Sequence, residues 1–132
     1  MPIHLQMRDG VIEAIFRGRI TGEDLQQLLE RLHDLESRLE VSPDRISDLS
    51  EAGVSELRSS DLVAFAERRA KVKLKNSVKS AVIAPGSTQY GLARMFWAHN
   101  ENPDIQIMIF KDSASAYNWI GLQAKPVDKP NA

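Results

Sequence analysis

The sequence predicts one α/β domain with a five-stranded, mostly parallel sheet. The chain has 132 residues, which is the length of one domain. Its apolar fraction (42%) and charged fraction (27%) are those of an ordinary globular protein. Stretches with the two-residue period of strands alternate with stretches that have helical periodicity. Strands and helices that alternate in this way form right-handed crossovers and a parallel sheet.

The chain begins with a hairpin signal. Residues 3–8 alternate between apolar and polar side chains, Asp9-Gly10 is a favoured two-residue turn, and residues 11–18 follow as a more buried strand. The first of these strands is expected to lie antiparallel at the edge of the sheet. A helix then starts after Thr21, which can form a capping box with Asp24, and ends before Ser42-Pro43. Its apolar stripe consists of Leu25, Leu28, Leu29, Leu32, Leu35 and Leu39.

Strands and helices alternate through the rest of the domain, giving the order β-β-α-β-α-β-α-β-α. The predicted strands cover residues 45–50, 77–85 and 105–110, and the predicted helices cover residues 60–75, 86–102 and 112–121. Asp112 or Ser113 can cap the last helix. The domain is therefore expected to span residues 1–121. Residues 122–132 contain two prolines and no apolar period, so they are expected to be a disordered tail.

Composition excludes several classes of function. Cysteine is absent, which removes disulfides, thiolate catalysis and cysteine-based metal sites. The net charge of −1 gives no global field for nucleic acid or a membrane surface. The N-terminus lacks a secretion signal, and no apolar stretch is long enough to span a bilayer. We therefore expect a cytoplasmic protein that binds no nucleic acid.

Catalytic signatures are also missing. The phosphate-binding glycine loops, the nucleophile elbow and the paired-histidine zinc motif do not occur. His4, His33 and His99 lie in separate predicted elements, without ligand spacing. No nucleophile–base pair can be assembled, so neither an enzyme nor a metal or cofactor site is expected.

A ligand site is expected where open α/β sheets bind their ligands, at the carboxyl ends of the strands. Asp48 ends a predicted strand there, and Tyr90 and Arg94 stand four residues apart on the third predicted helix. The Arg94 guanidinium could hold a carboxylate or phosphate. Structural roles are the alternative for all three residues: Asp48 can be a turn or capping acid, and Tyr90 and Arg94 can contribute to packing. Gly91 costs a helix about 1 kcal/mol against alanine, which predicts close packing over it.

Charge is distributed unevenly along the chain. Residues 23–61 hold eleven acids and four bases, whereas residues 68–79 hold six bases and no acid. The bases suit the negative end of a helix dipole, so a solvated face explains them. The alternative is an interaction surface for an acidic protein partner or a second copy. Trp97 adds surplus apolar surface that favours a homodimer. The candidate contact residues are Arg68, Arg69, Lys71, Lys73 and Trp97.

Two segments, "DLSEAGVSELRSSDLVAFA" and "YGLARMF", carry a resemblance to the SpoIIAA-like family. That family shares the STAS fold of the bacterial anti-sigma-factor antagonists, and the resemblance covers residues 3–120. It implies a non-enzymatic switch, and a link to lipid-binding SEC14-type domains has been drawn for the family. Ser59 falls on the serine that is phosphorylated in the antagonists. Arg58 replaces the aspartate of their motif and Asp61 replaces its glycine, so a helix cap formed by Ser59 or Ser60 is the alternative.

Together these observations predict a non-catalytic, STAS-like regulatory module that acts by binding an unknown protein partner. The alternative is a carrier or sensor of a small anionic or lipid-like ligand, bound at the carboxyl ends of the strands.

Overall fold

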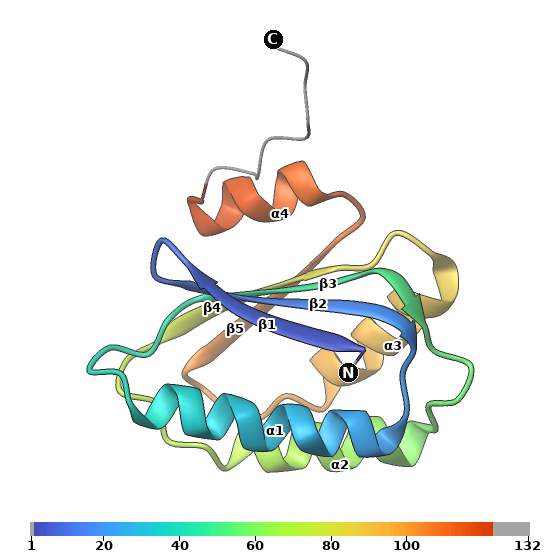
Figure 1. Ribbon diagram of the computed structural model, residues 1–132, viewed down its shortest axis with the longest axis horizontal. Helices are drawn as coiled ribbons and strands as arrows, with labels where there is room; N and C mark the ends of the chain where they lie inside the picture. The colour runs from blue at the N-terminus through green and yellow to red at the C-terminus, as the bar shows by residue number, and fades with distance from the viewer. Residues whose placement is uncertain (1, 123–132) are drawn as a thin grey trace, which may run out of the picture.

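The computed structural model describes residues 2–122 and shows one mixed sheet covered by helices on both faces (Figure 1). The strand order is β1-β2-β3-β4-β5, with β1 antiparallel to β2 and the other neighbours parallel. This confirms the predicted fold class. The strands are β1 (Ile3–Arg8), β2 (Val11–Arg19), β3 (Arg45–Gly53), β4 (Val78–Ile83) and β5 (Ile105–Phe110). The helices are α1 (Gly22–Ser37), α2 (Ser59–Ala70), α3 (Ser87–Ala98) and α4 (Ser113–Ile120).

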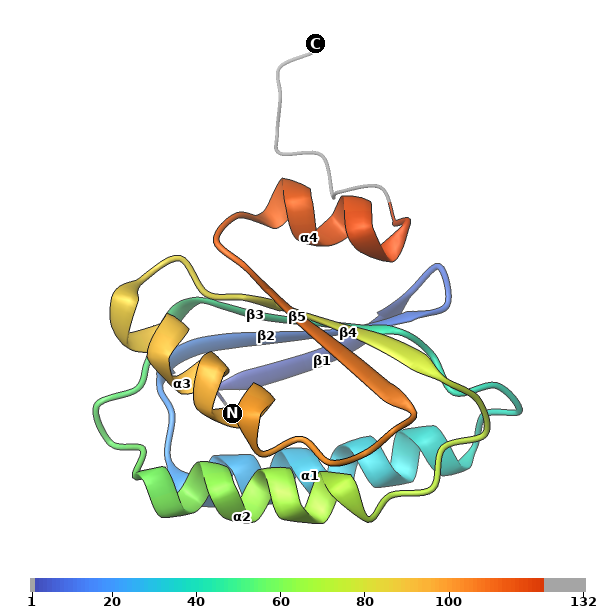
Figure 2. The same ribbon diagram turned by 180° about the vertical axis from the view of Figure 1, so that it is seen from behind.

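The helices are divided unequally between the two faces. Figures 1 and 2 show α1, α2 and α3 on one face and α4 alone on the other. Because successive strand residues point to opposite faces, β3 and β4 contribute to both cores. Ile46, Ala81 and Ile83 pack with α4, whereas Val78 and Val82 pack with α3. The larger core beneath α1 and α2 contains Ile3, Ile12, Phe16, Leu25, Leu28 and Leu32.

The β1–β2 hairpin forms as predicted. Asp9 has a φ of 51° and Gly10 a φ of 78°, so both turn residues adopt the left-handed conformation that a two-residue turn of this hand requires. The ladder pairs Arg8 with Val11 directly across the turn. This tight turn sets the register that places the side chain of Glu13 opposite that of Gln6.

Two helices have the N-terminal caps that the sequence predicts. Thr21 and Asp24 form the predicted capping box at α1, and the Asp112 carboxylate accepts the Ser115 N–H at 2.7 Å at the start of α4. The predicted serine cap of α2 is wrong. Arg58 is the N-cap, and its backbone N–H donates to the Asp61 carboxylate at 2.9 Å.

Three helices end earlier than the sequence predicts, and at α2 the cause is a polar side chain that binds the backbone beyond the last turn. The Nδ2 of Asn102 donates to the carbonyls of Arg69 and Val72 at 3.0 and 2.9 Å, which closes α2 after Ala70. α1 ends at Ser37, well before Ser42-Pro43, and α3 ends at Ala98.

The predicted tail begins one residue too early. Leu122 is only 8% exposed and belongs to the core beneath α4. The remaining tail residues, 123–132, lie outside the described residues, so the prediction for them is untested. Among the helices formed by residues 2–122, none has both the length and the apolar character needed to cross a bilayer.

Candidate ligand-binding site

An apolar cavity of about 110 Å³ lies between the sheet and the layer formed by α1, α2 and α3. Its apolar wall includes Phe16, Leu28, Leu32, Phe65, Leu92 and Phe96. For comparison, an engineered apolar cavity of about 150 Å³ in another protein stays dry and binds benzene. By the same scale, this cavity could enclose on the order of five carbon atoms.

One part of the cavity wall is polar. Arg45 and Ser47 both lie on the helix-facing side of β3, and Ser80 is the register partner of Arg45 on β4. Within residues 2–122, neither serine hydroxyl has a hydrogen-bond partner in the protein. Polar side chains are uncommon at such central strand positions, where apolar residues normally fill the core.

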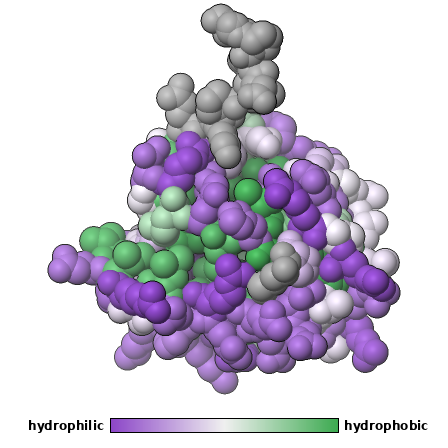
Figure 3. All heavy atoms as spheres, viewed as in Figure 1, coloured by the Kyte–Doolittle hydropathy of each residue, from purple (hydrophilic) through white to green (hydrophobic). Residues whose placement is uncertain are grey.

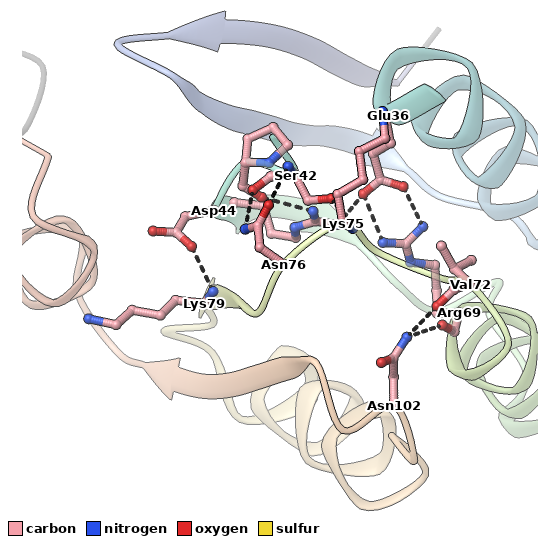
Figure 4. Close-up of polar contacts among 11 residues, drawn as sticks. Glu36, Ser42, Asp44, Arg69, Val72, Lys75, Asn76, Lys79 and Asn102 are labelled. Atoms are coloured by element: carbon pink, nitrogen blue, oxygen red, sulfur yellow. Dashed lines mark hydrogen bonds and ion pairs between the residues drawn. The ribbon is translucent and has the colours of Figure 1, made fainter. Parts of the chain in front are cut away.

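Behind this polar wall, Glu36 of α1 lies between two arginines. Nη1 and Nη2 of Arg69 each donate to one carboxylate oxygen of Glu36, both at 3.1 Å (Figure 4). Nη1 of Arg45 lies 2.6 Å from Oε2 of the same carboxylate. All three side chains are at most 8% exposed. Burial alone would raise the pKa of Glu36, but the two guanidinium groups outweigh it and hold the pKa below its usual value.

Hydrogen bonds connect the two loops that lead into β3 and β4, next to Arg45. The side-chain oxygen of Asn76 accepts the Ser42 N–H at 2.8 Å, and the Ser42 hydroxyl accepts the Lys75 N–H at 2.9 Å (Figure 4). The Lys79 N–H donates to the Asp44 carboxylate at 2.8 Å. These contacts join the segment before β3 to the segment before β4, so the position of Arg45 is set from both sides.

A second polar cluster fastens α4 to the opposite face. The Glu13 carboxylate, which lies on β2 and is 2% exposed as a residue, accepts from Arg8, Gln6 and the Tyr117 hydroxyl. Burial and the 2.6 Å hydrogen bond to Glu13 raise the pKa of Tyr117 to about 12. For Glu13, these hydrogen bonds outweigh the effect of burial and keep its pKa below the usual value. Because the Glu13 carboxylate and the Tyr117 hydroxyl bind each other, a structural role in holding α4 on the sheet explains this cluster.

The predicted ligand residues at the carboxyl ends of the strands do not line the cavity. The Asp48 carboxylate accepts from both the backbone N–H and the hydroxyl of Ser50, as in a turn. The amine of Lys111 lies over the Tyr90 ring at 5.2 Å, and the Arg94 guanidinium lies over the Trp97 ring at 5.9 Å. A site formed by these residues remains a prediction. The packing expected over Gly91 is wrong, because a methyl group added at this position would meet no neighbouring atom within 4 Å.

The predicted interaction surface is only partly available. Arg68, Lys71 and Lys73 are exposed and line a groove between the C-terminal ends of α1 and α2. Arg69 must be removed from this surface, because it is 4% exposed and bound to Glu36. Trp97 is 49% exposed but does not line this groove.

Ser59 is exposed and is the first residue of α2, with Ser60 second. Phosphorylation of Ser59 remains a prediction. No group of three or more histidine, aspartate or glutamate side chains within residues 2–122 could hold a metal ion.

Sequence reasoning missed the pair formed by Glu36 and Arg69, although a signal was present. Glu36 follows Leu32 by four residues and therefore lies on the apolar stripe of its helix. Arg69 follows Leu62 by seven residues and lies on the stripe of the next helix. Opposite charges on the buried stripes of neighbouring helices indicate a buried ion pair.

Comparison with known proteins agrees with the fold described above. The chain is similar to a crystal structure from Shewanella loihica PV-4, of an uncharacterised DUF3478-family protein with a SpoIIAA-like fold. The TM-score is 0.59, sequence identity is 18%, and the match covers 89% of this chain and 91% of that one. No protein-family model and no curated protein matches the sequence. The chain therefore has a SpoIIAA-like α/β fold.

Proposed function

We propose that this protein is a non-catalytic binding domain that holds a small, largely apolar molecule between its sheet and the α1–α3 layer. The cavity of about 110 Å³ is the observation that carries the proposal. Unfilled space of this size leaves the lining side chains without contacts that a ligand would supply. The ligand would act as the signal or cargo of the module, and a cytoplasmic location is part of the same proposal.

Benzene is a suitable first ligand, because it is neutral, apolar and close to the cavity in size. We expect benzene to cause saturable NMR shifts in the methyl groups of Leu28, Leu32 and Leu92, which line the cavity. Shifts that are absent, or that grow without saturation, would contradict the proposal.

Two substitutions within α3 make a matched comparison. Ala93 is 3% exposed and lines the cavity, so Ala93→Leu should fill the space and abolish benzene binding. Ala98 is exposed at the end of the same helix, so Ala98→Leu should leave binding unchanged. Ala14→Val tests the opposite wall if the first variant does not fold.

Protein binding is a second candidate function, and the charge pattern of the α1–α2 layer favours it. A groove at the N-terminal ends of these helices is lined by four acids and one base: Glu23, Glu30, Glu56, Asp61 and Arg58. The groove at their C-terminal ends carries the exposed bases described above. Apolar groups also reach the surface: Figure 3 shows an apolar band between α1 and α4, and Met7 is 40% exposed.

A measurement of self-association tests whether these charged grooves form an interface between two copies or are simply solvated. Two copies packed antiparallel through α1 and α2 would bring acidic and basic grooves together, so the dimer should weaken as salt rises. Sedimentation equilibrium should show this dependence, and Lys71→Glu should weaken the dimer. A monomer at high protein concentration and low salt would rule out this mode.

A further inference from the structure

We propose that the ligand of the cavity is a small carboxylate with an apolar chain, and that Arg45, Ser47 and Ser80 bind its carboxylate group. This inference rests on the proposed function and adds the chemical class of the ligand. Its starting point is the polar wall of the cavity. No other part of the cavity wall presents a charged side chain without a complete set of partners within residues 2–122.

The buried charges beside the cavity do not balance. Arg45 and Arg69 bring two positive charges and Glu36 brings one negative charge, which leaves a net charge of +1. Both carboxylate oxygens of Glu36 are already used by Arg69. An unbalanced charge is costly to bury unless a counter-charge or further hydrogen bonds stabilise it.

Arg45 has donors left for such a counter-charge. Its Nη2 donates to the Pro43 carbonyl at 2.9 Å. Its Nη1 lies close to Glu36 without forming a hydrogen bond of acceptable geometry, and its Nε has no acceptor within residues 2–122. Buried guanidinium donors normally find partners, so these two unpartnered nitrogens call for an acceptor. Both are closed to a water molecule, so an anion in the cavity that Arg45 lines reaches them once the guanidinium turns toward it.

Electrostatics support an anion at this position. Burial lowers the pKa of Arg45, while the nearby carboxylates of Glu36 and Asp44 act in the opposite direction. Asp44 does not complete the site, since one oxygen of its half-buried carboxylate accepts the Lys79 N–H. A second carboxylate inside the cavity would stabilise the charged guanidinium further and accept charge-assisted hydrogen bonds.

The shape of the site selects the rest of the ligand. The two serine hydroxyls stand beside Arg45 and can donate to the same anion, whereas the remaining wall is mainly apolar. A chain of about five carbons matches the volume. Pentanoate therefore has both required parts, and 1-pentanol has the same chain without the charge.

The test compares these two compounds by isothermal titration calorimetry and methyl NMR at pH 7, where a carboxylate is ionised. We expect pentanoate to bind at least tenfold more tightly than 1-pentanol, with saturable shifts at cavity methyl groups. Arg45→Met should remove this difference without unfolding the protein, because Glu36 and Arg69 remain as a balanced pair. Arg38→Met removes an exposed arginine of similar size and should preserve the difference.

The remaining outcomes distinguish the two proposals. Equal binding of pentanoate and 1-pentanol would overturn the carboxylate inference and leave the apolar binding function standing. Failure of pentanoate, 1-pentanol and benzene alike would overturn both. Acetate or chloride binding as tight as pentanoate would overturn the role of the apolar chain. If Arg45→Met fails to fold, Ser80→Ala provides the second variant, and an unchanged preference for pentanoate in it would remove Ser80 from the site.

Discussion

The ion pair between Glu36 and Arg69 gives the sharpest prediction about stability. Replacing Glu36 with glutamine keeps the shape of the side chain but removes its charge, and it leaves the guanidinium groups of Arg45 and Arg69 buried without a carboxylate. Removing one partner of a buried ion pair costs about 3–5 kcal/mol. For a chain of this length, such a loss lowers Tm by about 10–20 °C.

The matched control lies two residues earlier in the sequence. Asp34 pairs with Arg38 at 2.8 Å, but the side chains of Arg38 and Asp34 are 70% and 62% exposed. Exposed pairs at this helical spacing contribute about 0.3–0.5 kcal/mol, so Asp34→Asn should change the free energy of unfolding very little. Urea unfolding of both variants measures the difference. A cost for Glu36→Gln below about 1 kcal/mol, or equal to that of Asp34→Asn, would show that the buried pair does not stabilise the fold as argued.

The pH dependence checks the same interaction independently. The pKa of Glu36 lies below its usual value of 4.5 in the folded protein. The stability that this shift contributes is therefore fully present above pH 4.5 and is lost as pH falls through the lowered folded pKa. Acid unfolding curves should show this loss in the wild-type protein and a smaller loss in Glu36→Gln. Curves that run parallel would contradict the prediction.

Three further substitutions test other parts of the fold. Gly91→Ala should stabilise the protein by about 1 kcal/mol in urea unfolding, because no neighbouring atom obstructs the added methyl group; destabilisation would mean that the helix surface is covered. Asn102→Ala should cost about 1–3 kcal/mol by the same assay, since it leaves two carbonyls at the end of α2 without their donor; an unchanged midpoint would contradict that role. In an ultraviolet titration, the phenolate signal of Tyr117 is the part of the wild-type signal that is missing in Tyr117→Phe. This part should have its midpoint near pH 12, and a midpoint near 10 would show that the hydroxyl is not held by Glu13. Because the folded pKa is raised, the stability that Tyr117 contributes is present below pH 10 and is lost as pH rises toward 12.

The order and type of every strand and helix could be predicted from the sequence because each has a strong periodic pattern or turn signal. Asp9-Gly10 identifies the hairpin, and the leucine stripe identifies α1. Helix ends are less predictable because distant side chains determine them. Asn102, for example, closes α2 from more than thirty residues away in sequence.

The candidate site could not be predicted in the same way, because a cavity depends on how side chains from several elements pack together. Arg45 and Ser80 are separated along the chain and become neighbours only through the register of β3 and β4. Local charge counts assign Glu36 and Arg69 to solvated faces, since such counts do not distinguish a buried charged residue from an exposed one. Their positions on the apolar stripes were the available signal.

The most direct test of the proposed site is a crystal structure of the protein grown with 3-(methylthio)propanoate, an analogue of pentanoate whose sulfur can be located by anomalous scattering. We expect a sulfur peak inside the cavity near Leu28 and Leu92, with the carboxylate within hydrogen-bond distance of the Arg45 guanidinium. A peak confined to the protein surface, or an unoccupied cavity at saturating ligand, would contradict the proposed site.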